Sequence, residues 1–117
     1  MREVLRDPGR LEQMLTNIDN AIRFYTDNRS IDFTEKDLAF YALVKAVEIV
    51  GEAAYMLTDE FKRSHPDTPW RKIVGMRHIL VHGYYQIRKD DLLEVVQNDL
   101  PPLRQQIERY LKEYPKE

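Results

Sequence analysis

The chain has 117 residues, of which 43% are hydrophobic and 32% are charged, and its formal net charge at pH 7 is −2. This length and composition predict one folded domain over residues 1–117, and they exclude an intrinsically disordered chain and a globally basic nucleic-acid binder. Because there is no cysteine, no apolar run of about 18 residues and no secretion signal, we expect a soluble cytoplasmic protein without disulfides, thiolate zinc sites or membrane contact.

The first predicted helix begins near residue 10, after a turn expected at residues 7–9 (Asp-Pro-Gly). Apolar side chains recur along it at spacings of three and four residues, which is the period of one helical face. They are Leu11, Met14, Leu15, Ile18, Ile22 and Tyr25. The pattern stops near residues 28–30.

A second helix is expected from Asp37 to about Lys62, with Thr34 as the cap at its start. Its apolar residues cover more than one stripe, which is typical of a helix that packs on two neighbours or across a dimer. Gly51 lies in the middle of this helix, where glycine costs about 1 kcal/mol relative to alanine. Either another backbone passes close to Gly51 or the helix bends there.

Thr68 and Pro69 are expected to be the N-cap and the first residue of a third helix. This helix continues to His82 and stops at Gly83, a residue type that often ends helices. Trp70, at the start of the helix, is expected to anchor the core.

A fourth helical region begins near residues 90–91, and its apolar stripe continues past Pro101 and Pro102. Since each proline removes a backbone hydrogen bond, we expect a kinked or two-part helix there. The stripe consists of Leu92, Val96, Leu100, Leu103, Ile107, Tyr110 and Tyr114. Four main helices without any strand signal predict an all-α bundle.

The segment from Trp70 to Lys89 is locally basic, because it contains five Lys or Arg residues, two His and no Asp or Glu. A solvated helix face is the simpler interpretation. The alternative is a site for phosphate or another anion, since Arg and His donate charge-assisted hydrogen bonds to phosphate oxygens. Arg77 and His82 differ by about 140° around an α-helix. They therefore meet only if the helix unwinds near Gly83 or if a second chain supplies the other half.

Other catalytic and metal sites find little support. His78 and His82 are four residues apart, but no carboxylate nearby in the sequence completes a metal site, so we expect no metal. The two serines, Ser30 and Ser64, are not in a nucleophile elbow, and no Gly-rich phosphate loop occurs, so we expect no cofactor.

Glu48 and Glu52 share one face of the second predicted helix, four residues apart, where like charges repel mildly. The simpler interpretation is an exposed patch that Lys45 partly relieves. The alternative is that one of these carboxylates points at Arg77 and orients it.

The sequence contains AVEIVGEA at residues 46–53, PWRKIVGMRHILVHGY at residues 69–84 and NDLP at residues 98–101. Together these three segments resemble the HepT-like branch of the HEPN superfamily. The combination of an Arg-x4-His-x-Tyr motif, an upstream Pro-Trp and the Glu-Ile-Val-Gly-Glu block is more specific than any one part. One departure is visible at residues 91–95 (DLLEV), where many relatives have an aromatic residue.

The resemblance implies an up-and-down helical bundle that forms a two-fold homodimer, with the Arg and His of both chains lining a shared cleft. It implies the toxin half of a toxin–antitoxin pair that cleaves RNA without a metal. The implied partner is a nucleotidyltransferase antitoxin that transfers AMP onto the motif tyrosine. Carried over to this sequence, the catalytic residues are Arg77 and His82, the supporting polar residue is His78, and the AMP acceptor is Tyr84.

The residue types suit this chemistry, because a histidine with a pKa near 6.5 can act as acid or base and an arginine can stabilise charge on phosphate. A second interpretation stays open, in which the chain is a non-catalytic module that binds nucleotide or RNA. A third is a purely structural dimer, which leaves the acid-free basic segment without an explanation.

Overall fold

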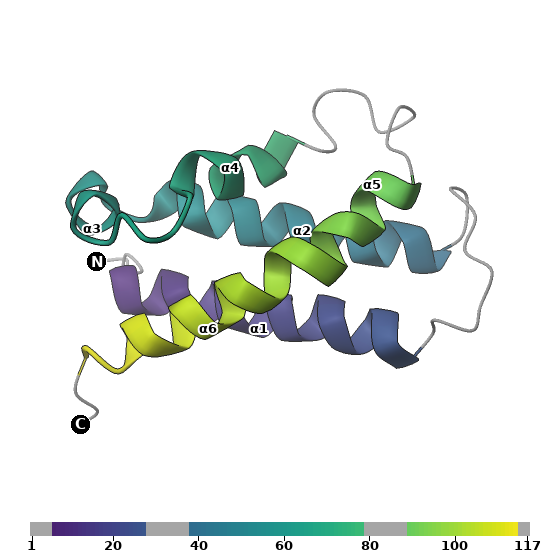
Figure 1. The fold of residues 1–117 in the computed structure, drawn as a ribbon, viewed down its shortest axis with the longest axis horizontal. Coiled ribbons are helices and arrows are strands. Elements are labelled where there is room, and N and C mark those ends of the chain that lie inside the picture. Colours follow the sequence, from purple (N-terminus) through teal and green to yellow (C-terminus); the bar gives the residue numbers. More distant parts are fainter. Residues whose placement is uncertain (1–5, 28–37, 79–88, 115–117) are drawn as a thin grey trace, which may run out of the picture.

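The computed structural model describes residues 6–27, 38–78 and 89–114, and every secondary-structure element within these ranges is helical (Figure 1). The elements are α1 (Asp7–Asp27), α2 (Leu38–Met56), α3 (Asp59–Ser64), α4 (Trp70–Gly75), the 3₁₀ turn η1 (Met76–His78), α5 (Lys89–Glu94), the π-helical turn η3 (Val95–Asp99) and α6 (Leu100–Leu111). The all-α prediction is confirmed. The expectations at Thr34, Asp37, His82, Gly83 and Tyr84 lie outside the described residues.

Helices α1 and α2 lie side by side and run in opposite directions (Figure 1). The segment formed by α4 and η1 packs along α2, and the α5–η3–α6 segment returns across α1. Both predicted apolar stripes face the core between these segments, so their buried members include Leu11, Met14, Ile18, Leu92, Val96, Leu100, Leu103 and Ile107. Among the described helices, none combines the length and the apolar character that a membrane span requires.

Helix α1 begins earlier than expected, because residues 7–9 form its first turn and not a separate turn before it. Pro8 fits there, since the first backbone N–H groups of a helix have no intrahelical partner. The Asp7 carboxylate accepts hydrogen bonds from the Thr58 backbone N–H (3.0 Å) and from the Thr58 hydroxyl (2.8 Å). Asp7 therefore ties the start of α1 to the corner between α2 and α3.

The expected single helix up to Lys62 is wrong, because α2 ends at Met56 and α3 begins at Asp59. Thr58 lies between them in an extended conformation, and its hydroxyl accepts a hydrogen bond from the Phe61 backbone N–H at 3.1 Å. A side-chain oxygen of this kind satisfies a backbone N–H that has no partner within the helix. Thr58 thus acts as an N-cap that starts a new helix.

The sequence suggested that the Thr68 side chain caps the third helix, and this prediction is wrong. Helix α4 begins at Trp70, and its N-cap residue Pro69 makes no side-chain hydrogen bond. The Thr68 side chain is buried and donates to the Gln106 side-chain oxygen at 2.7 Å, and it lies 2.6 Å from the Tyr110 hydroxyl. Thr68 therefore joins the α3–α4 loop to α6.

The His65 imidazole lies in the same corner and stacks on the Phe61 ring, with 4.0 Å between ring centroids. Its Nδ1 is 2.8 Å from the Phe61 carbonyl oxygen and its Nε2 is 2.9 Å from the Glu113 carboxylate. Burial lowers the pKa of His65, but these two hydrogen bonds and the nearby carboxylates outweigh it, so the pKa is raised. Trp70 is buried and donates from its indole N–H to the His65 carbonyl oxygen at 2.8 Å, as expected of a core anchor.

The fourth helical region consists of two parts, as predicted, but the interruption precedes the prolines. The π-helical turn η3 ends at Asp99, and Pro101 and Pro102 lie in the first turn of α6. The wider turn places both prolines where a helix does not need their missing N–H groups. Asp19 of α1 and Arg104 of α6 form an ion pair that joins these two helices.

Candidate active site around Arg77

Arg77 and His78 are carried by the 3₁₀ turn η1 and not by the expected continuous α-helix, since α4 ends at Gly75. The expectation of an angle of about 140° between Arg77 and His82 concerns a residue outside the described ranges. His78 is partly buried on this turn, directly after Arg77.

Gly51 lets η1 lie directly on the backbone of α2. A Cβ atom at Gly51 would lie 2.9 Å from the Met76 carbonyl carbon and 3.1 Å from the Arg77 Cα, and closer still to the Arg77 backbone nitrogen. Side-chain carbons do not approach backbone atoms this closely. Of the two explanations for this glycine, the close backbone approach is therefore the correct one, and it fixes the start of the Arg77 side chain.

The Arg77 guanidinium is held on the outer surface of α2. Its Cζ atom lies 3.9 Å from the centre of the Tyr55 ring, which is a cation–π contact. Its Nη1 is 3.8 Å from a Glu52 carboxylate oxygen, too far for a hydrogen bond, and its buried Nε has no hydrogen-bond partner within the described ranges. The side chain is 28% exposed. Arg77 is thus held in place by the Tyr55 ring, and its partly exposed guanidinium forms no hydrogen bond with any described residue.

The two carboxylates on α2 have different neighbours. Glu48 lies 3.2 Å from the Lys45 ammonium, as the simpler interpretation expects, but its side chain is only 20% exposed and does not form an exposed patch. Glu52 is 56% exposed and lies beside Arg77. This position agrees with the alternative interpretation, in which one of the two carboxylates points at Arg77. Only Glu52 is therefore in a position to orient Arg77.

Tyr55 is a neighbour of Arg77 that sequence reasoning did not identify. It lies three residues after Glu52, so both side chains occupy the same face of α2. Its ring is 48% exposed although it is a large aromatic side chain. Glu52 and Tyr55 together form the surface on which the Arg77 side chain rests.

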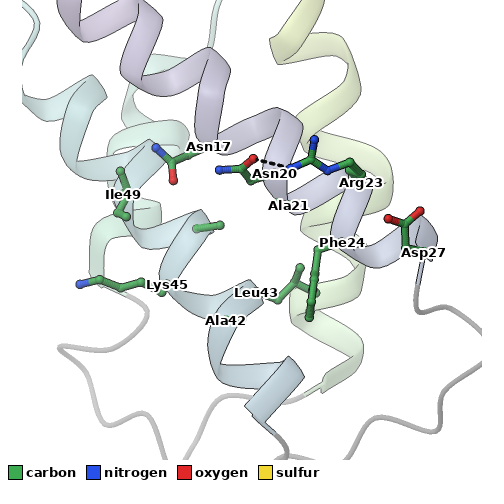
Figure 2. A pocket seen from close by; sticks show the side chains of 11 residues that line it. Asn17, Asn20, Ala21, Arg23, Phe24, Asp27, Ala42, Leu43, Lys45 and Ile49 are labelled. Carbon is green, nitrogen blue, oxygen red and sulfur yellow. Dashed lines mark hydrogen bonds between the residues drawn. The ribbon is translucent and has the colours of Figure 1, made fainter.

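A groove of about 510 Å³ lies elsewhere, between α1 and α2 (Figure 2). Asn17, Asn20 and Arg23 of α1 face Lys45 of α2 across it, and Arg23 donates a hydrogen bond to Asn20 at 3.1 Å. Among the predicted site residues that the structure describes, namely Glu48, Glu52, Arg77 and His78, none lines this groove. The described residues also contain no group of three or more His, Asp or Glu side chains arranged to hold a metal ion.

Comparison with known proteins gives a consistent result. The family model described as "Ribonuclease HepT-like" matches residues 14–110. A protein of Methanocaldococcus jannaschii named "Putative RNase" is 32% identical over 98 residues, which cover 84% of this chain and 90% of that protein. A protein of Thermococcus cleftensis named "Probable ribonuclease HepT" is 38% identical over 72 residues, which cover 62% of this chain and 66% of that protein. No solved structure gives a significant match.

Proposed function

The chain belongs to the HepT-like ribonuclease family, and on this basis we propose that it cleaves RNA at a site built around Arg77. The observation that carries the proposal is the position of the guanidinium, which stacks on Tyr55 and forms no hydrogen bond with any described residue. A planar, permanently charged guanidinium matches two phosphate oxygens at once. It suits the negative charge that develops on the phosphate during cleavage.

In the proposed reaction, a base takes the proton from the 2′-hydroxyl of the RNA, and the resulting oxygen attacks the neighbouring phosphorus. The bond from phosphorus to the 5′-oxygen breaks, and an acid gives a proton to this leaving oxygen. His82 is the proposed acid or base, because histidine changes its protonation near neutral pH. His78 is the supporting polar residue, and Glu52 orients Arg77. No metal takes part.

The proposed assembly is a homodimer in which two copies of His82 divide the acid and base roles. Helix α2 supports this, since it exposes the large apolar side chains of Leu38, Tyr41, Tyr55 and Met56. Such side chains on one helix favour contact with another chain. Light scattering at micromolar concentration should give twice the 14.0 kDa chain mass. A monomer at this concentration would contradict the shared cleft.

The proposed regulation is transfer of AMP onto the Tyr84 hydroxyl by a nucleotidyltransferase antitoxin encoded with this toxin. The added phosphate carries about one negative charge close to Arg77 and competes with the substrate phosphate. Mass spectrometry after co-expression should find the AMP mass on the peptide that contains Tyr84. Tyr84→Phe should stay active and escape neutralisation. Modification at Tyr85 would contradict the assignment.

The direct test of the reaction is incubation of the purified protein with RNA in the presence of a chelator. The proposal predicts cleavage products that end in 2′,3′-cyclic phosphates. RNA that is bound but left intact would instead indicate the non-catalytic binding module.

A further inference from the structure

Helices α3 and α4 form the walls of a shallow hollow of about 450 Å³. Its lining contains three cationic side chains and one carboxylate, around an apolar floor. The lining residues are Asp59, Lys62, Arg63, Trp70, Arg71 and Val74. The whole chain has a formal charge of −2, so this surplus of positive charge is a local feature.

The two arginines of the hollow differ from the cations that are neutralised by a carboxylate. Lys45, Lys72 and Arg104 each form an ion pair with a carboxylate. Arg63 and Arg71 are exposed and make no hydrogen bond or ion pair with any described residue. Two unpaired guanidinium groups in one hollow provide a favourable site for phosphate oxygens.

The two other charged residues of the hollow, Asp59 and Lys62, carry opposite charges, so the positive charge of the two arginines remains. Asp59 lies in the first turn of α3, where the helix dipole stabilises a carboxylate. Lys62 donates hydrogen bonds to the carbonyl oxygens of Ala54 (3.1 Å) and Tyr55 (3.4 Å) at the end of α2. Its ammonium thus adds positive charge at a fixed position.

The hollow and the site around Arg77 are linked through the end of α2. Lys62 contacts the backbone of Tyr55, and the ring of Tyr55 lies under the Arg77 guanidinium at 3.9 Å. Arg71 lies on α4, which leads directly into the turn η1 that carries Arg77. The subsite requires one RNA strand to extend from Arg77 to the hollow.

We propose that the α3–α4 hollow is a second phosphate-binding subsite for RNA, in which Arg63 and Arg71 hold the strand beyond the cleaved phosphate. The assignment rests on the proposed function, because it takes Arg77 to bind the phosphate that is cleaved. Backbone contacts of this kind bind RNA without regard to sequence. The subsite lengthens the RNA that the enzyme prefers, and it leaves the chemistry at Arg77 unchanged.

The test compares the double variant Arg63→Ala/Arg71→Ala with the wild type. The probe is a fluorescently labelled single-stranded RNA in which every 2′-hydroxyl is methylated, so that it binds and is not cleaved. The logarithm of the binding constant falls linearly with the logarithm of the salt concentration, with a slope of about −0.7 per phosphate contact for single strands. Loss of two contacts should make the slope less steep by about 1.4.

The matched control is Arg109→Ala/Lys112→Ala, which removes the same charge from exposed positions on and after α6, outside the hollow. It should leave the slope at the wild-type value. An equal change of slope in both double variants would overturn the proposal, because it would then reflect net charge alone. An unchanged slope in Arg63→Ala/Arg71→Ala would overturn the proposal too. If this variant instead binds the nucleotidyltransferase partner more weakly, the hollow is a protein contact and the proposal is wrong.

A second measurement separates this proposal from the proposed function. The double variant in the hollow should cleave a dinucleotide at the wild-type rate and show a raised KM for long RNA, because the single phosphate of a dinucleotide is the one that Arg77 binds. Equal loss of activity on both substrates would contradict a separate subsite. If the wild type cleaves neither substrate, the proposed function fails. The salt dependence of binding then still tests whether Arg63 and Arg71 contact RNA phosphates.

Discussion

Gly51 of α2 and Arg77 of η1 meet backbone to backbone, with a spacing that leaves no room for a Cβ atom on the glycine. A glycine inside a helix normally destabilises it by about 1 kcal/mol relative to alanine. Here the missing side chain allows the turn with Arg77 to pack against α2. The same contact places the guanidinium next to Tyr55 and Glu52.

Gly51→Ala should therefore destabilise the protein by about 1–3 kcal/mol, the usual cost of forcing extra atoms into packed space. Gly75→Ala is the matched control, because a Cβ atom there meets nothing within 4 Å. It should leave the free energy of unfolding unchanged or raise it by up to about 1 kcal/mol. Urea unfolding monitored by circular dichroism measures both variants. Equal stability of the two would contradict the close approach.

Tyr55→Ala should reduce RNA cleavage by about 2- to 5-fold, which corresponds to the 0.5–1 kcal/mol of an exposed cation–π contact. Tyr55→Phe keeps the ring under Arg77 and should retain the wild-type rate, because the proposed role needs the ring and not the hydroxyl. Steady-state cleavage of a labelled RNA measures both variants. An equal loss in Tyr55→Phe would show that the hydroxyl carries the effect.

Much of the fold follows from local patterns. The stripe that includes Leu11 and Ile18 and the stripe that includes Leu92 and Ile107 are buried as predicted, since each reflects the period of a single helix. The end of α2 was missed for the same reason, because the apolar spacing continues through the break to Phe61. The capping side chain of Thr58 decides the boundary there.

Contacts between distant segments could not be read from the sequence. The Thr-Pro pair at residues 68–69 is typical of a helix start, but the Thr68 hydroxyl meets Tyr110, 42 residues later. Likewise, the sequence left open whether Glu52 is solvated or lies beside Arg77. Only the packing of η1 on α2 brings Glu52 and Tyr55 to the Arg77 side chain.

Thr68→Val should destabilise the protein by about 1–3 kcal/mol, because it keeps the shape of the side chain and leaves the buried hydroxyl of Tyr110 without its partner. Thr16→Val is the matched control on the exposed side of α1 and should change stability by less than about 0.5 kcal/mol. Thermal and urea unfolding of both variants measure the difference. A small effect at position 68 would contradict the role of this hydroxyl in joining the α3–α4 loop to α6.

Stability should fall as the pH rises through the neutral range, because the pKa of His65 is raised in the folded protein. A raised pKa means that the folded state binds the proton more tightly than the unfolded state. The resulting stabilisation is fully present below the ordinary value of 6.5, and it is lost as the pH rises above 6.5 through the folded-state pKa. Urea unfolding at a series of pH values measures this dependence.

Glu113→Gln isolates the contribution of His65, since it removes the carboxylate that lies 2.9 Å from Nε2 and keeps a hydrogen-bonding side chain. The two proteins differ at this one position only, so the comparison reports on the contact between His65 and Glu113. The variant should lose less stability than the wild type over the same rise in pH. Identical pH dependence in both proteins would show that the contact with Glu113 does not raise the pKa.

The central claim is that Arg77 binds the phosphate at which RNA is cleaved. Its most direct test is the rate at which Arg77→Ala releases 2′,3′-cyclic phosphate ends from RNA in the presence of a chelator, compared with the wild type and with Arg109→Ala. Loss of one donor to a developing anion typically lowers the rate by about 100- to 1,000-fold. We predict a loss of this size for Arg77→Ala with unchanged helix content, and wild-type activity for Arg109→Ala. An Arg77→Ala protein that cleaves RNA at the wild-type rate would contradict the account.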